Sequence, residues 1–415
     1  MKKIWLLLLA LSLLFVGCGG KNDKDDKVVI KYALWDSVQA PVYRELADQF
    51  EKNNPNIKVE FETTPYGQYW TKLQAATTGG QMPDVVWMNG PNFLKYASYD
   101  MLLPLNEMIK KDSIDMNKYV EGIKNLYQYE GKQYGIPKDV DSIALWYNKD
   151  LFDKADLQYP TDQWTWNDMK RAAIKIQANV KGVYGVAIPV YEDQSSYYNI
   201  IPQNGGSIIS KDRKVSGYGD KNTVQAIEML KDLFDEKASP DYTTMLENKA
   251  TQMFQSEQLA MVYQGSWRAS PLDADEKVNS HIGVVTMPKI KNNSTVVHGI
   301  GFAIGKNSKH PEAAWKFIKF LSNKESNDYI AKSGIVIPAY TESQELWAEN
   351  YKNIDVSAHI KALENNVSYP VSFDTAKWSH VQDEYLTKVW AGTMNPKEAA
   401  KKIKTEMDSI LKSEK

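Results

Sequence analysis

Residues 28–88 read VVIKYALWDSVQAPVYRELADQFEKNNPNIKVEFETTPYGQYWTKLQAATTGGQMPDVVWM. Short apolar or alternating segments in this run are separated by segments whose apolar residues recur at helical spacing. The order β-α-β-α-β predicts a largely parallel sheet with helices on both faces. We predict strands at 28–35, 57–62 and 84–88, and helices at 41–51 and 66–77.

The same alternation resumes after residue 160 and again predicts α/β structure. Two runs of this kind, separated by other segments, indicate two α/β lobes with the chain crossing between them more than once. The predicted helices are 167–178 with Asn167 as its cap, 223–236 and 311–321, the predicted strands are 183–188, 259–263, 281–285 and 299–305, and 342–412 is predicted to be mainly helical.

The N-terminus has the pattern of a secretory signal. Lys2 and Lys3 precede an apolar run over 4–16, which is too short to anchor stably across a bilayer of about 30 Å. The single cysteine, Cys18, follows directly, and 14–18 resembles a bacterial lipobox, whose cysteine becomes the lipidated first residue of the mature protein. The alternative is an ordinary secreted protein cut nearby. With one cysteine, no disulfide framework exists.

Composition and motifs argue against several function classes. The net charge of -2 offers no case for nucleic-acid binding. The sequence contains no Gly-x-Ser-x-Gly nucleophile motif and no phosphate-binding Gly-rich loop, and the 5 His are scattered without a zinc pattern. We therefore expect a protein that is not an enzyme and needs no cofactor or metal. The 12 Trp and 24 Tyr favour an aromatic binding cleft instead.

Six segments fit one pattern by their joint order and spacing. They are Gly80–Val86, Gly131–Pro137, Leu145–Phe152, Gly265–Trp267, Gly299–Ile304 and Pro311–Phe317. Together they resemble the family-1 extracellular solute-binding proteins, the sugar-binding lipoproteins of ABC importers that are related to maltose-binding protein. The resemblance covers nearly all of the mature chain.

The resemblance implies an α/β, two-lobed periplasmic-binding-protein-like (type II) fold with a multi-strand hinge and a ligand cleft between the lobes. The chain would cross near 137–142, 297–301 and 334–340, where Gly and Pro suit segments that absorb backbone rotation. The implied divisions are a signal peptide at 1–17, a lipidated cysteine and flexible tether at 18–27, lobe one at 28–140 plus 299–338, and lobe two at 141–298 plus 339–415.

The function implied is capture of a sugar or oligosaccharide outside the cytoplasm and its delivery to the permease subunits of an ABC transporter. We expect a monomer that meets the membrane only through its lipid anchor. Two alternatives stay open: a binding protein for another solute, such as a polyamine, a peptide or a metal complex including iron, and a surface glycosidase that uses paired carboxylates.

A sugar offers apolar C–H faces that suit aromatic rings, and hydroxyls that suit carboxylates and amides. The resemblance implies a stacking role for Trp267 and a sugar contact for Asp141, with Asp139 as its competitor. Trp35, Asp36 and Asn89 follow predicted strands, where ligands of open α/β sheets bind. Their alternatives are structural: a core tryptophan, a helix cap and a turn residue.

A second group of candidates is drawn from the aromatic cluster at 191–198, from the crossings and from the C-terminal region. Each has a packing or turn alternative, and His298, also in a crossing, is more often structural than a ligand. The group comprises Arg268, Tyr66, Tyr191, Glu192, Tyr197, Tyr198, Asn204, Gly205, Gly299 and Trp378 with Asp374 nearby.

Overall fold

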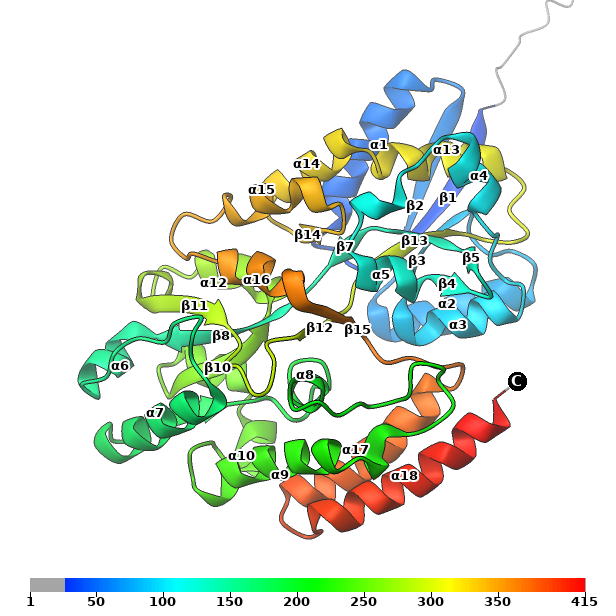
Figure 1. Cartoon of the computed structure of the whole chain (residues 1–415). Coiled ribbons are helices and arrows are strands. Elements are labelled where there is room, and N and C mark those ends of the chain that lie inside the picture. Colours follow the sequence, from blue (N-terminus) through cyan, green and yellow to red (C-terminus); the bar gives the residue numbers. More distant parts are fainter. Residues whose placement is uncertain (1–26, 415) are drawn as a thin grey trace, which may run out of the picture.

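Two β-sheets form the centre of the structure, a computed structural model that describes residues 27–414 (Figure 1). The first sheet has the strand order β2-β1-β3-β13-β6. Strands β1, β2 and β3 are parallel, whereas β13 is antiparallel to both β3 and β6. The strands are β1 Val28–Leu34, β2 Ile57–Thr63, β3 Val85–Asn89, β6 Gly135–Pro137 and β13 Ile300–Ile304.

The second sheet has the order β11-β8-β10-β9. Strand β8 runs antiparallel to both β10 and β11, and only β9 and β10 are parallel. All seven residues of β10 and all six of β8 are buried, as expected for central strands covered on both faces. The strands are β8 Ile143–Asn148, β9 Tyr184–Ala187, β10 Leu259–Gly265 and β11 Ile282–Thr286.

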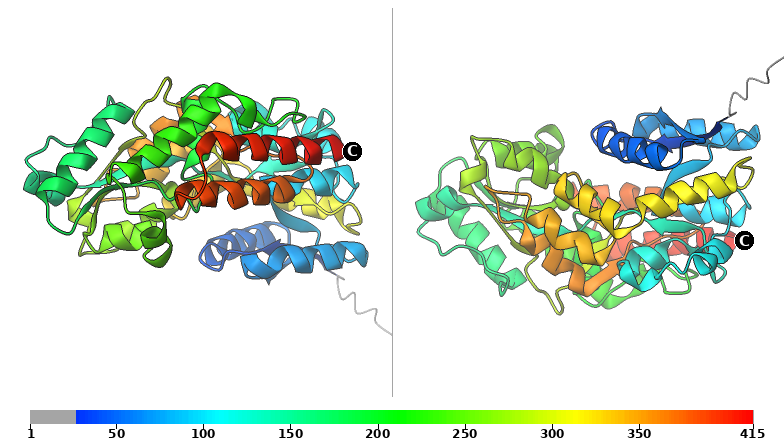
Figure 2. Two further views of the ribbon diagram at one scale, coloured as in Figure 1. Left: turned by 90° about the horizontal axis from the view of Figure 1, so that it is seen from below. Right: turned by 90° about the horizontal axis from the view of Figure 1, so that it is seen from above.

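Helices cover both sheets. Around the first sheet, α1 and α13 pack on one face through an apolar cluster that includes Tyr43 and Phe317, and residues of α2 and α3 are buried in a second cluster. The C-terminal helices α17 and α18 lie side by side and contact α9 (Figures 1 and 2). These helices are α1 Ala40–Asn53, α2 Tyr66–Thr78, α3 Gly90–Ser98, α9 Lys221–Asp235, α13 Pro311–Leu321, α17 Thr375–Trp390 and α18 Pro396–Ser413.

Further helices fill the connections between these elements. They are α4 Asn106–Lys111, α5 Glu121–Leu126, α6 Lys149–Lys154, α7 Trp166–Asn179, α8 Tyr197–Gln203, α10 Tyr242–Glu247, α11 Ala250–Gln255, α12 Ala269–Asp273, α14 Lys324–Lys332, α15 Gln344–Ala348 and α16 Ser357–Ala362. Within residues 27–414, no helix combines the length and apolar character needed to cross a membrane.

The predicted strands and helices are confirmed, with three corrections. Helix α7 is capped by Thr165, which exchanges hydrogen bonds with Asp168 in a capping box, so Asn167 is a helical residue and not the cap. The first sheet is mixed, because β13 returns antiparallel from far along the chain. The region 342–412 is broken by loops and by the strand β15, Asn366–Ser368.

The three predicted crossings lie side by side. Strand β7, Asp139–Val140, pairs with β14, Ile337–Pro338, and Asp141 forms an isolated bridge with His298. Lys138 N–H donates to the carbonyl of Ile300 at 2.8 Å, and Asp141 N–H donates to that of His298 at 2.8 Å. The chain thus passes between the two sheets through hydrogen-bonded backbone, while the residue boundaries of the two lobes stay a prediction.

Gly299 is required by this close approach. A Cβ at this position would lie 2.1 Å from the carbonyl oxygen of Asp139 and 3.2 Å from the Cα of Val140. Any side chain would therefore push the first and second crossings apart.

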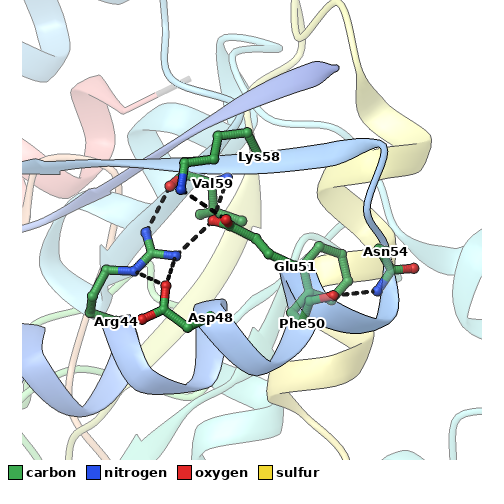
Figure 3. Close-up of polar contacts among 7 residues, drawn as sticks. All are labelled: Arg44, Asp48, Phe50, Glu51, Asn54, Lys58 and Val59. Carbon is green, nitrogen blue, oxygen red and sulfur yellow. Dashed lines mark hydrogen bonds and ion pairs between the residues drawn. The ribbon is translucent and has the colours of Figure 1, made fainter. Parts of the chain in front are cut away.

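The outer edge of the first sheet is closed by side chains of α1 (Figure 3). Arg44 donates to the carbonyl of Val59 at 2.8 Å, and the N–H of Val59 donates to Glu51 at 3.0 Å. Arg44 and Lys58 also donate to the carboxylate of Glu51, at 2.7 and 2.8 Å. Among the described residues, strand β2 has no further neighbour in this sheet, so these bonds occupy backbone groups that an edge strand leaves open.

We predict that Glu51→Gln lowers the free energy of unfolding by about 1–2 kcal/mol at pH 7, because it weakens charge-assisted hydrogen bonds. Partial burial opposes ionisation of Glu51, but hydrogen bonds from Lys58, Val59 and Arg44 hold its pKa below the usual value. The carboxylate therefore stabilises the fold above its usual pKa, and this contribution is lost as the pH falls through the lowered one.

Urea titrations at pH 7 and at pH 3 measure this effect. The matched control is Asp48→Asn, which alters an exposed carboxylate paired with the same arginine and should cost less than about 0.5 kcal/mol. Equal losses for the two variants at pH 7 would contradict the role given to Glu51.

Candidate functional site

A cavity of about 830 Å³ lies where the crossings meet the ends of β1, β3 and β10. Its lining combines aromatic rings with carboxylates and backbone of all three crossings. The structure brings eight of the predicted site residues together here: Trp35, Tyr66, Asn89, Asp141, Tyr191, Glu192, Trp267 and Gly299.

Trp35 forms the aromatic wall on the side of the first sheet. It follows β1 and is held edge-to-face by Tyr69, Trp87 and Tyr66, with ring centroids at 5.0, 5.2 and 5.5 Å. Such pairs contribute stability beyond their buried area. Trp35 is therefore both a packing residue and part of the cavity surface. The two interpretations left open by the sequence, ligand contact and core packing, are compatible.

Trp267 is the most exposed tryptophan in the cavity lining, with 41% of its surface accessible. It lies in the 3-10 turn Ser266–Arg268 that follows β10. A Cβ on Gly265 would lie 2.1 Å from its ring, so the indole rests directly against the backbone of the strand end. The glycine therefore allows a large apolar ring to lie along the cavity wall instead of inside the core.

Asn89 serves two partners at once. Its side-chain oxygen accepts from the N–H of Asn92 at 3.2 Å and caps α3, and its amide donates to the hydroxyl of Tyr66 at 3.2 Å. Tyr66 itself is 53% exposed and begins α2. Helix capping thus orients a polar pair along the cavity wall.

Asp141 lies in the first crossing, and its carboxylate is held by the 191–195 loop and by the backbone of the second crossing. Oδ1 accepts from the amide of Gln194 at 2.5 Å and from the N–H of His298 at 3.0 Å. Burial raises the pKa of Asp141 to about 7, and the charge of Asp139 adds to this rise, whereas the two hydrogen bonds oppose it.

Lys138, next to this site, is a buried cation that the sequence analysis did not single out. Its ammonium donates to Gln39 at 2.8 Å and to Asp139 at 2.5 Å, and it lies 4.2 Å from the ring centre of Trp87. Burial lowers the pKa of Lys138, and the charge of Asp139 opposes that effect. Asp139, the competitor of Asp141, is therefore paired within the protein, although it also lines the cavity.

His298 lines the cavity as a hydrogen-bond acceptor. Its Nε2 accepts from the N–H of Gly90 at 3.3 Å, and its ring packs on Tyr369 at 5.1 Å. Burial lowers the pKa of His298 to about 4, against the opposing charge of Asp139. The imidazole is therefore neutral at physiological pH.

Eight predicted residues do not line the cavity, and we do not carry them into the proposed site. They are Asp36, Arg268, Tyr197, Tyr198, Asn204, Gly205, Asp374 and Trp378. Asp36 accepts from the N–H of Val38 and from the amide of Gln39, both at 2.8 Å, so it acts as a turn residue before α1. Arg268 is half-buried, and its Nε has no hydrogen-bond partner within residues 27–414.

Three more of these residues, Tyr197, Asn204 and Trp378, are structural. Tyr197 is 2% exposed and packs edge-to-face on Tyr198 at 5.0 Å. Asn204 donates to the carbonyl of Asn222 at 2.7 Å. Trp378 is fully buried and donates to Ser372 at 2.7 Å. Each lies on a helix or at a helix end whose apolar face is directed inward. Hydrophobic composition alone does not predict that orientation.

Several lining residues went unnoticed in the sequence. The aromatic cluster at 191–198 pointed to the right loop, but Asp193, Gln194 and Ser195 between the tyrosines were not selected. Asp383 on α17 carries no sequence signal, because its helix reaches the cavity only through tertiary packing. In the described part of the chain, no group of three or more His, Cys, Asp or Glu is arranged to hold a metal ion.

We predict that Asp141→Asn stabilises the protein at pH 8 relative to the wild type. The carboxyl titrates near 4 in an unfolded chain and at about 7 in the fold. A folded-state pKa above the unfolded one means that wild-type stability is lost as the pH rises toward 7, whereas the amide does not titrate. The difference should grow from about pH 4 to pH 7 and then stay level, at no more than about 4 kcal/mol.

Urea titrations at pH 4, 6 and 8 give the measurement. Asp355→Asn is the control, since within residues 27–414 this exposed carboxylate accepts only the N–H of Ser357, and an asparagine retains that acceptor. A pH-independent difference between Asp141→Asn and the wild type would contradict the raised pKa.

Known proteins resemble this chain in sequence and in fold. The sequence profile of the bacterial extracellular solute-binding proteins matches residues 35–328. A maltooligosaccharide ABC transporter solute-binding lipoprotein of Streptococcus pneumoniae is 26% identical over 419 residues, covering 97% of this chain and 95% of its own. An arabinooligosaccharide-binding protein of Bacillus subtilis is 25% identical over 345 residues, covering 78% of this chain and 76% of its own.

Among solved structures, an ABC substrate-binding protein of Listeria monocytogenes in complex with cycloalternan has a TM-score of 0.81 and 28% identity, covering 93% of this chain and 100% of its own. These matches confirm the predicted resemblance and the two-lobed α/β fold. Because the matched family is extracellular, the protein acts outside the cytoplasm. The chain belongs to the family of bacterial extracellular solute-binding proteins.

Proposed function

We propose that this protein captures an oligosaccharide in the interlobe cavity and delivers it to the permease of an ABC importer. The observation that carries the proposal is Trp267, a large ring left 41% exposed in a cavity whose remaining lining is rich in carboxylates. Aromatic faces bind the C–H surfaces of a sugar, and carboxylates accept its hydroxyl protons. The oligosaccharide-binding relatives from Streptococcus, Bacillus and Listeria support the same ligand class.

The cavity has the size and composition for such a ligand. Its volume of about 830 Å³ lies within the range of small-molecule sites. Trp267 would stack on one sugar ring, Trp35 would face a second, and Asp141 and Glu192 would accept hydroxyls. Glu192 already accepts from Ser195 at 2.9 Å, which keeps its carboxylate oriented for a further donor.

Closure follows from the position of the crossings. Their residues 139–141, 298–300 and 335–337 all line the cavity, so ligand contacts and hinge backbone share the same segments. A ligand that touches both lobes stabilises the closed form by its differential affinity for that form. Closure also removes water from the cavity and strengthens the polar contacts inside it.

The oligomeric state, the partners and the membrane anchor belong to the same proposed role. The protein would act as a monomeric binding subunit without catalytic activity or cofactor, and its partners would be the permease subunits. Cys18, which lies outside the described residues, would carry the lipid that holds the protein at the membrane surface. The pneumococcal relative, itself a lipoprotein, supports that anchor.

We predict that Trp267→Ala weakens oligosaccharide binding by tenfold or more, because the loss of a stacked indole costs on the order of 1–3 kcal/mol. Titration calorimetry with malto- and arabino-oligosaccharides measures the dissociation constant. Tyr99→Ala serves as the control, since it removes a ring that is 59% exposed but does not line the cavity. An unchanged dissociation constant in a folded Trp267→Ala protein would remove Trp267 from the site.

The same sugars distinguish binding from hydrolysis. We expect the purified protein to return the oligosaccharide intact, with no increase in reducing ends over the incubation. Turnover that persists through repurification would establish a glycosidase and overturn the proposal.

The anchor has its own test. We predict that Cys18→Ser moves the protein from the membrane fraction to the medium or the soluble extracytoplasmic fraction, because a serine cannot carry the thioether-linked lipid. Fractionation of expressing cells followed by immunoblotting measures the distribution. Retention of the variant in the membrane fraction would contradict lipid anchoring through Cys18.

A further inference from the structure

The charge of the cavity lining is one-sided. Five carboxylates line the cavity, and within residues 27–414 no lysine or arginine does. They come from separate parts of the chain, from the first crossing, the 191–195 loop and helix α17. The five are Asp139, Asp141, Glu192, Asp193 and Asp383.

Only part of this negative charge is neutralised by the protein. Asp139 is paired with the ammonium of Lys138 at 2.5 Å. Asp193 accepts from the hydroxyl of Tyr369 and from the N–H of Gln194, which are neutral donors. His298 supplies no positive charge, because its Nε2 accepts a hydrogen bond from Gly90 and burial keeps the ring neutral.

Asp383 is the least constrained of the five. It lies on α17 and is exposed, with no hydrogen bond or ion pair to another side chain in the described part of the chain. Partial burial, followed by the charge of Asp193, raises the pKa of Asp383, while His380 opposes the rise. Burial likewise raises the pKa of Asp193 against its hydrogen bonds. Both pKa shifts come mainly from burial, and the like charge of Asp193 adds to that of Asp383.

We propose, as an extension of the oligosaccharide-binding function proposed above, that the cavity selects its saccharide by charge, favouring amine-bearing sugars over uncharged ones and rejecting uronic acids. The geometry carries the inference: carboxylates without a cationic partner, from the first crossing, the 191–195 loop and helix α17, line the space a ligand would fill. An ammonium group there supplies the missing counter-charge, whereas a ligand carboxylate adds repulsion in a space that closure shields from water. An uncharged sugar uses the same carboxylates only as hydrogen-bond acceptors.

The experiment compares matched ligands by calorimetry at pH 8 and low salt. The probes are maltotriose and arabinotriose, each as the parent sugar, as a derivative with one primary hydroxyl replaced by an amine, and as a derivative with that carbon oxidised to a carboxylate. For a sugar whose parent binds, we expect the amine to bind at least fivefold tighter than the parent and the carboxylate at least tenfold weaker. Moderate salt should reduce both differences.

Two results separate the inference from the function on which it rests. Equal or tighter binding of the carboxylate derivative, beside a parent sugar that binds, would overturn charge selection and leave oligosaccharide binding standing. Failure of every parent and every derivative to bind would overturn the proposed function, and the inference with it.

A charge reversal tests the role of the lining itself. Asp383→Lys should strengthen binding of the carboxylate derivative at least fivefold and remove the advantage of the amine. The matched control is Glu384→Lys, which makes the same charge change on the same helix at an exposed residue that pairs with Lys388 and does not line the cavity. An equal effect of the two variants would show that net charge, not the lining, sets the preference, and would overturn the proposal.

Discussion

The close contact of the three crossing segments is the constraint on which the rest of the structure depends. Backbone hydrogen bonds join the first crossing to both of the others, and Gly299 lets the first two approach to a distance that no side chain would permit. Since these segments connect the two sheets, their contact also determines where the two lobes meet. The cavity forms at that junction, and one of its carboxylates, Asp141, is itself part of the crossing.

Around this junction the two sides of the cavity contribute different chemistry. The end of β1 and the start of α2 supply aromatic rings locked by edge-to-face contacts, with Trp35 at their centre. The loop at 191–195 and helix α17 supply carboxylates and an amide. Trp267 adds an aromatic surface beside these polar groups. We propose that a ligand with both apolar faces and hydroxyls contacts both sides when the lobes come together around it.

Burial of polar groups at this junction has an energetic cost that the fold offsets only in part. Lys138 and Asp139 form a buried pair with further hydrogen bonds, and His298 remains neutral. Asp141 keeps two hydrogen bonds, yet its pKa still rises to about 7, mainly because of burial. Such destabilised groups often lie at sites where a ligand completes their interactions, which agrees with the binding role proposed for this cavity.

Much of the fold could be predicted from local pattern. The alternation over residues 28–88 indicated β1, α1, β2, α2 and β3 to within a few residues, because side-chain periodicity directly reflects which face is buried. Strand β13 could not be placed antiparallel in the first sheet from its own residues, since that pairing depends on a return from more than 200 residues away. Asn89 both caps α3 and lines the cavity, so the structural and the ligand-binding interpretations of this residue are compatible.

By itself, the sequence determined the order of strands and helices, the family, and the short motifs in which Trp267 and Asp141 stand, since all of these are carried by neighbouring residues. Only the tertiary structure decided which aromatic rings are exposed: Trp267 rests on a glycine at a strand end, whereas Trp378 lies on the inward face of a packed helix. It also decided that acids as distant as Asp141 and Asp383 share one cavity. The physical reason is that exposure and electrostatic interaction depend on distances in space, which packing between remote segments sets.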